Sequence, residues 1–109
     1  MATQFKNTVV KDVGILPILA LETDAATNST IIGLTLSNLT DFITYASIII
    51  HDDTSVEGYF MKDVMIPPNS SLKALSPGEK LIIAPSNQLY LQASDDESYD
   101  AVISYVNIV

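Results

Sequence analysis

The feature of the sequence that most restricts its fold is an alternation of apolar and polar residues with a period of two. Apolar side chains at every second position lie on one face of a β-strand. Within residues 30–38, Ile32, Leu34 and Leu36 are predicted to share one face, with Ile31 on the other. A similar alternation is found in residues 45–50, 88–94 and 101–108. In the last of these segments both faces carry apolar side chains, which indicates that both faces are covered.

Clusters of Pro, Asn, Asp and Ser separate these segments and are typical of turns. Strands are expected near residues 6–12, 16–21, 30–38, 43–51, 56–65, 71–75, 80–84, 88–94 and 99–108. Short strands at this spacing predict an all-β fold, a single antiparallel β-sandwich of jelly-roll or Ig-like type with about eight strands over residues 1–109. The simplest wiring pairs strands that follow one another in the sequence. Residues 1–12 are the least patterned and are a candidate N-terminal arm that orders against a neighbouring molecule.

The charge balance argues against several classes of partner. The chain has 13 acidic and 5 basic residues, a formal net charge of −8, and no cysteine. Such a surface repels phosphate backbones, so we expect neither nucleic acid nor an anionic membrane as a partner. Without cysteine there is no disulfide or thiolate chemistry. The first residues lack a basic lead before an apolar run, and no apolar stretch approaches the roughly 20 residues of a membrane helix, so we expect a soluble protein without a signal peptide.

No stretch of the sequence predicts a catalytic, cofactor or metal site. His51 is followed by Asp52 and Asp53, but adjacent residues at a strand end point to different sides, which favours a polar turn over a metal site. The acidic stretch at residues 95–100 has neither the glycine nor the ligand spacing of a calcium loop, and is predicted to be a solvated loop. A Gly-x-Ser-x-Gly nucleophile motif is also absent from the chain. The sequence therefore predicts no enzyme and no cofactor.

The order of the strand motifs resembles that of a known group of proteins. Ile31–Asp41 reads as a strand, a turn and the entry to the next strand, and Ile66–Leu72 precedes Glu79–Ile83. Gln88–Ser94 then leads into Asp100–Val106. This succession resembles small β-sandwich virion proteins of tailed bacteriophages over most of residues 28–108. The sequence departs from that pattern near residues 12–27.

The resemblance implies a protein present in many copies on a virion and made in the host cytoplasm. Capsid decoration, in which a cement protein stabilises the phage head, is the preferred role, with a neck, tail or fibre component as the alternative. It implies a homo-oligomer, with a trimer favoured, and contacts with other virion proteins such as the major capsid protein. It transfers no catalytic residues.

Five apolar residues are the candidates for contacts between subunits: Phe5, Val9, Val10, Tyr59 and Phe60. Tyr59 and Phe60 are adjacent, so in a strand they face opposite ways and at least one is exposed or at an interface. Two other functions stay open at this point. One is a carbohydrate- or receptor-binding module that uses exposed tyrosines such as Tyr59 and Tyr90. The other is a small hydrolase that uses acidic residues, which has the least support.

Overall fold

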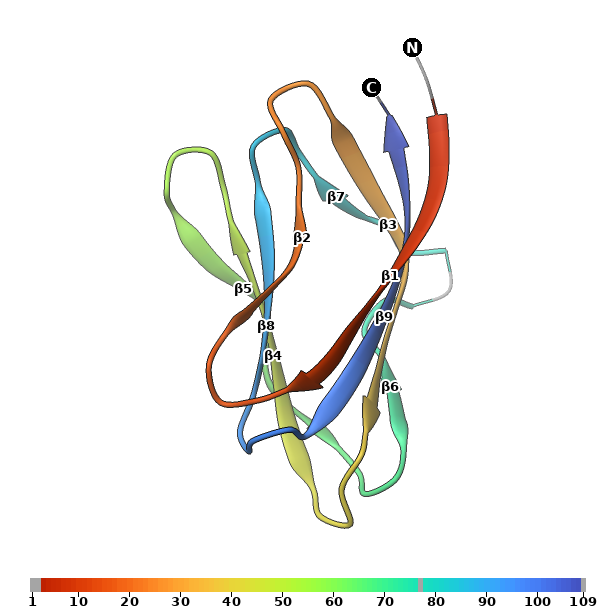
Figure 1. The fold of residues 1–109 in the computed structure, drawn as a ribbon, viewed down its shortest axis with the longest axis vertical. Helices are drawn as coiled ribbons and strands as arrows, with labels where there is room; N and C mark the ends of the chain where they lie inside the picture. Colours follow the sequence, from red (N-terminus) through yellow and green to blue (C-terminus); the bar gives the residue numbers. More distant parts are fainter. Residues whose placement is uncertain (1–2, 77, 109) are drawn as a thin grey trace.

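Two antiparallel sheets lie face to face in the computed structural model, which describes residues 3–76 and 78–108 (Figure 1). The strands are β1 (Thr3–Val13), β2 (Ile18–Glu22), β3 (Asn28–Asn38), β4 (Thr44–His51), β5 (Glu57–Ile66), β6 (Ser71–Lys73), β7 (Leu81–Ile83), β8 (Gln88–Ala93) and β9 (Tyr99–Ile108). Each predicted strand range overlaps one of these strands. The prediction of an all-β antiparallel sandwich is therefore confirmed. None of the described residues forms a helix with the length and hydropathy that a membrane crossing needs.

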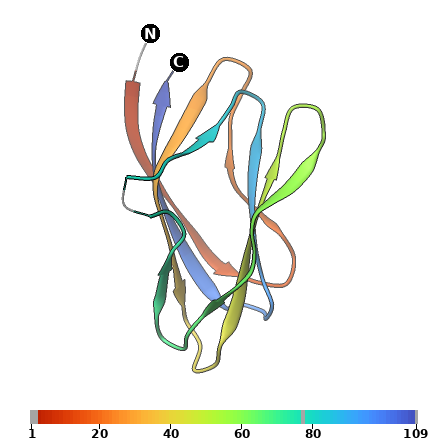
Figure 2. The same ribbon diagram turned by 180° about the vertical axis from the view of Figure 1, so that it is seen from behind.

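The strand order is that of a jelly roll. The first sheet runs β1-β9-β3-β6, with β7 also paired to β3, and the second sheet runs β2-β8-β4-β5. Counting β6 and β7 as one interrupted strand, β1 pairs with β9, β2 with β8, β3 with β6 and β7, and β4 with β5. These nested pairs are those of one long hairpin wound into two sheets, as the two opposite views show (Figures 1 and 2).

The wiring differs from the simplest one expected from the sequence. Among the described strands, β4 and β5 are the only sequence neighbours that pair with each other, because most other connections cross from one sheet to the other. Crossing lets consecutive strands bury their apolar faces against each other in the core between the sheets. The structure also differs from the expected N-terminal arm, because the described part of that segment is a strand of the first sheet. Thr3–Val10 pairs residue by residue with β9, while residues 1 and 2 of that range lie outside the described residues.

A β-bulge in β3 changes which residues face the core. The register with β9 shifts between Ile31 and Gly33, so Ile32 is an extra residue in the strand. As a result Ile31 and Leu34 are fully buried, whereas Ile32 is half exposed. The prediction that Ile32 shares a face with Leu34 and Leu36 is therefore wrong, because strict alternation does not anticipate a bulge.

The core lies between the two inner faces and is almost entirely aliphatic. Its largest fully buried side chains are Ile31, Leu34, Leu36, Ile48, Ile66, Ile83, Leu89, Leu91, Ile103 and Tyr99. Tyr99 of β9 donates a hydrogen bond of 2.9 Å from its hydroxyl to the carbonyl oxygen of Gln92 in β8, which ties the two sheets together. Burial raises the pKa of this hydroxyl, so it stays a neutral donor.

A buried asparagine fixes one end of the sandwich. Asn38, only 4% exposed, donates from Nδ2 to the carbonyl oxygens of Phe42 (2.8 Å), Ile66 (3.1 Å) and Pro67 (3.2 Å). Its Oδ1 accepts from the backbone N–H and the hydroxyl of Thr40, both at 2.8 Å. One side chain thus holds the β3–β4 turn against the end of β5, because buried backbone carbonyls need partners.

We expect Asn38→Ala to lower the free energy of unfolding by about 2–4 kcal/mol, because it leaves buried carbonyl groups without donors. Urea unfolding followed by circular dichroism measures the change. Asn28→Ala, at an exposed position of β3, is the matched control and should change stability by less than about 0.5 kcal/mol. Equal losses in the two variants would contradict the role given to Asn38.

Candidate interaction surfaces

On the outer face of the first sheet, a row of mostly apolar side chains crosses four strands. Phe5 of β1 lies opposite Val106 of β9, Val106 lies opposite Thr30 of β3, and Thr30 lies opposite Ile82 of β7. Phe5 is 79% and Ile82 66% exposed. Val9 lies opposite Val102 on the same face, and both are exposed. Contiguous exposed apolar side chains mark interaction surfaces more often than single ones do.

The five candidate contact residues divide between surface and core. Phe5 and Val9 are exposed on β1, whereas the neighbouring Val10 is only 8% exposed and belongs to the core. Val10 is therefore unavailable for a surface contact, because adjacent strand residues face opposite sides. Tyr59 is exposed, while Phe60 is half-buried and packs against the core, as the expected opposition of the two predicts.

The outer face of the second sheet has its own row across all four strands. Leu19 of β2 lies opposite Tyr90 of β8, Tyr90 opposite Ile49 of β4, and Ile49 opposite Tyr59 of β5. Ile49 is only 8% exposed although it points outward, since large neighbours flank it on both sides. The ammonium group of Lys62 lies 5.2 Å from the centre of the Tyr59 ring, within cation–π range.

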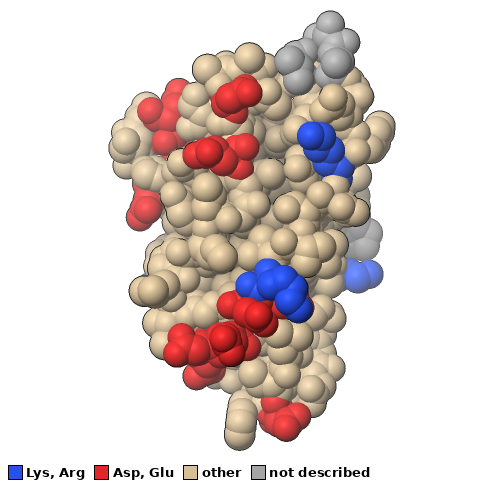
Figure 3. All heavy atoms as spheres, in the orientation of Figure 1, with Lys and Arg blue, Asp and Glu red and all other residues tan. Residues whose placement is uncertain are grey.

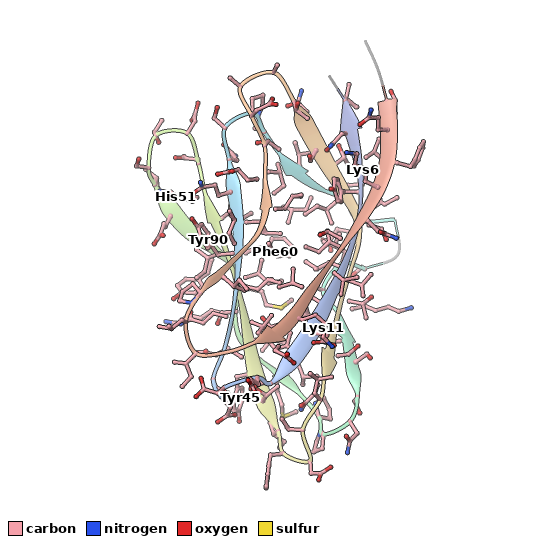
Figure 4. All side chains as sticks on the ribbon, viewed as in Figure 1. Lys6, Lys11, Tyr45, His51, Phe60 and Tyr90 are labelled. Atoms are coloured by element: carbon pink, nitrogen blue, oxygen red, sulfur yellow. The ribbon has the colours of Figure 1, made fainter. Side chains whose placement is uncertain are left out.

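Polar side chains line this second face beside Tyr90. The Tyr90 hydroxyl donates to Oε1 of Gln88 at 3.1 Å, and Nε2 of Gln88 donates to Oε2 of Glu22 at 2.6 Å. The His51 ring lies 6.5 Å from the Tyr90 ring, centre to centre, and the two side chains lie near each other in Figure 4. An aromatic ring beside amide and carboxylate groups suits hydroxyl-rich ligands, because each polar group accepts or donates hydrogen bonds.

Charge is unevenly divided between the two halves of the molecule. The first sheet and its β6–β7 connection carry four lysines (Lys6, Lys11, Lys73, Lys80) against three acidic residues (Asp12, Glu79, Asp100). The second sheet and its β4–β5 turn carry one lysine against five acidic residues: Glu22, Asp52, Asp53, Glu57 and Asp63. The lysines that can be seen in Figure 3 lie over the first sheet, and much of the acidic surface lies over the second. The first sheet is thus close to neutral and the second strongly acidic.

The end of β1 is held to β9 by an ion pair. Nζ of Lys11 lies 3.1 Å from Oδ2 of Asp100, and the backbone N–H of Asp12 donates to Oδ1 of Asp100 at 2.9 Å. Burial raises the pKa of the Asp100 carboxyl, but the Asp12 amide and the Lys11 ammonium together outweigh it, so the pKa is lowered overall. The hydrogen bond to Asp100 in turn raises the pKa of Lys11.

His51, Asp52 and Asp53 lie at the end of β4 and in the β4–β5 turn. Oδ1 of Asp52 accepts hydrogen bonds from the backbone N–H and hydroxyl of Thr54 and from the N–H of Val56, at 2.7–3.0 Å. These bonds, led by that of the Thr54 hydroxyl, lower the pKa of Asp52. Within residues 3–76 and 78–108, no three His, Asp or Glu side chains are grouped as metal ligands. The outer faces of the two sheets are the candidate interaction surfaces.

Sequence reasoning missed most of the first-sheet row. Val102 and Val106 belong to residues 101–108, in which both strand faces carry apolar side chains. That pattern is the one sequence feature that indicates an apolar outer face here. Ile82 sits in a three-residue strand, which is too short for a readable alternation. Only the pairing of β7 with β3 brings it into line with Phe5 and Val106.

Comparison with known proteins adds information on the fold. No protein-family model and no curated protein sequence matches the chain. A similar solved structure is that of Bacillus endospore appendages, described as a novel family of disulfide-linked pili. It has a TM-score of 0.53 and 6% sequence identity, over 96% of this chain and 85% of the other. The likeness shows the fold alone.

Two viral particles give weaker likenesses. The virus-like particle of the extra small virus of the giant freshwater prawn Macrobrachium rosenbergii has a TM-score of 0.38 at 9% identity, over 98% of this chain and 80% of the other. The VP2 subviral particle of infectious bursal disease virus has a TM-score of 0.31 at 8% identity, over 96% of this chain and 41% of the other.

The exposure of Phe5 and the burial of Val10 predict very different losses of stability from the same substitution. Val10→Asp places a carboxylate in an aliphatic core and should lower the free energy of unfolding by about 3 kcal/mol or more. Phe5→Asp should change it by less than about 0.5 kcal/mol, because the side chain is in solvent. Urea unfolding of both variants tests the assignment, and a large loss of stability in Phe5→Asp would contradict it.

Proposed function

We propose that this chain is a non-enzymatic structural subunit of a virion, present in many copies, which decorates the capsid. Its partners are other copies of itself, as a trimer in the form that the resemblance to phage proteins implies, and the major capsid protein. The observation that carries the proposal is the row formed by the exposed Phe5 and Ile82 with the partly buried Val106, on the near-neutral sheet of a strongly acidic chain.

The physical character of the surface supports this role. A subunit that is covered by its neighbours needs exposed apolar groups and few charges at the contact, whereas its free surface benefits from like charge that keeps particles apart. The first sheet has the apolar, weakly charged character expected of the contact surface. The second sheet, with its acidic residues, has the character expected of the free surface. The jelly roll shared with a pilus subunit agrees with a structural role, and a neck, tail or fibre position would use the same surfaces.

A second candidate function is a carbohydrate- or receptor-binding module. The hydrogen-bonded series from Tyr90 through Gln88 to Glu22, with the exposed Tyr59 on the same sheet face, favours it. A glycan array tests this candidate, with Tyr90→Ala as the variant that should lose any binding. The absence of binding by the folded protein would remove it.

The structural role is tested on particles from the virus that encodes the chain. Virions and tailless heads are banded in density gradients, and the chain is counted against the major capsid protein by quantitative mass spectrometry. Decoration predicts many copies in both bands, while a neck, tail or fibre component is lost with the tails. A chain found only in the soluble fraction would contradict the structural role.

A further inference from the structure

The four sheet edges of the sandwich are protected to very different degrees. An open edge presents unpaired N–H and C=O groups, and proteins block such edges with bulges, prolines, charges or short strands. β2 has five residues, follows Pro17 and contains a register shift between Leu19 and Leu21. The opposite edge of the first sheet is split into β6 and β7, of three residues each. Both of these edges are poor templates for another strand.

The edge of β5 is also protected. Its pairing with β4 shifts register twice, between Ala46 and Ile48 and between Ile48 and Ile49. Asp63 has a positive φ of 49°, and the strand carries charged side chains at Glu57, Lys62 and Asp63. Bulges and charges of this kind disfavour the addition of a strand.

The edge of β1 is different. Thr3–Val10 pairs with β9 over eight residues without a register shift, and the segment contains no proline and one charged residue, Lys6. The first irregularity comes between Val10 and Val13. A regular strand of this length at an exposed edge is a template for β-strand addition, in which backbone hydrogen bonds supply the affinity.

We propose that β1 pairs antiparallel with β1 of a second copy, about a two-fold axis at Asn7. This inference rests on the proposed structural function and deepens it by naming one contact between copies, which joins subunits of neighbouring trimers because a closed three-fold trimer contains no two-fold contact. A two-fold contact brings the same surface of both copies together. In this register Phe5 lies opposite Val9 of the second copy, and the same pair recurs on the other side of the axis. Two exposed apolar pairs then cover each other on the outer face, as cross-strand pairs do within a sheet.

Neighbouring registers are less favourable. Moving the axis to Lys6 places the two Lys6 ammonium groups directly opposite each other, and moving it to Thr8 places Phe5 opposite Lys11. With the axis at Asn7, Lys6 lies opposite Thr8 of the second copy, so no like charges are opposed. The near-neutral first sheet also lets two acidic chains approach, whereas pairing through the second sheet would bring its acidic residues together.

The absence of cysteine makes a direct test possible. Asn7→Cys places two thiols opposite each other at the axis, where a disulfide or a short bifunctional thiol reagent joins them. Thr3→Cys is the matched control on the same strand, because its symmetry mate lies eight residues away, about 27 Å along the strand. Oxidation is carried out on the full-length protein at high concentration and on decorated particles. We expect a covalent dimer from Asn7→Cys and monomer from Thr3→Cys.

A second experiment checks the register with different residues. Phe5→Cys and Val9→Cys, mixed in equal amounts, should cross-link to each other and not to themselves. Circular dichroism confirms that each exposed-site variant is folded. Absence of cross-links in both experiments, or equal cross-linking of Asn7→Cys and Thr3→Cys, overturns the pairing. A trimer by light scattering, or many copies on particles, without the Asn7→Cys cross-link also overturns it and leaves the structural function standing.

Discussion

The architecture depends on the central position of β9 in the first sheet. Tyr99–Ile108 pairs with β1 on one side and with β3 on the other, so the last strand joins the first strand to the middle of the chain. Pairings between residues so far apart in the sequence form only after long loops have closed. β9 thus joins β1 to the rest of its sheet, and its inner face contributes Tyr99, Ala101 and Ile103 to the core.

This topology also determines where the surfaces of interest lie. Because β9 fills the centre, β1 is left with one neighbour and an open edge, and its outer side chains Phe5 and Val9 continue the apolar row of β9. The second sheet presents aromatic and acidic side chains instead. The two sheets share the core, and their outer faces differ in charge and polarity in the way expected of one covered and one free surface.

The strands were predictable from the sequence because alternation and turn residues are local signals. Leu89, Leu91 and Ala93 follow the predicted alternation and are buried, and His51 ends its strand as expected. Local signals do not indicate which strands pair across long distances in the sequence. The bulge at Ile32 reverses the expected face of that residue, and the nested strand order replaces pairing between sequence neighbours.

The candidate surfaces were predictable only in part, for the same reason. Phe5, Val9 and Tyr59 are exposed apolar residues that composition and alternation single out, but Val10 lies on the opposite side of its strand from Val9 and is core. The row through Val106 and Ile82 requires the register of four strands. The role of Asn38 depends on carbonyl groups from the β3–β4 turn and from the end of β5, which meet only in the folded chain.

We infer that the β1 edge is open in the free subunit and covered in the assembly. Hydrogen–deuterium exchange, compared between the dilute protein and the assembled form, tests it directly. Those amides of Thr3–Val10 that point away from β9 are expected to gain protection on assembly, while those of the β4–β5 turn are not. Unchanged exchange in Thr3–Val10, with new protection only on the second sheet, would contradict it.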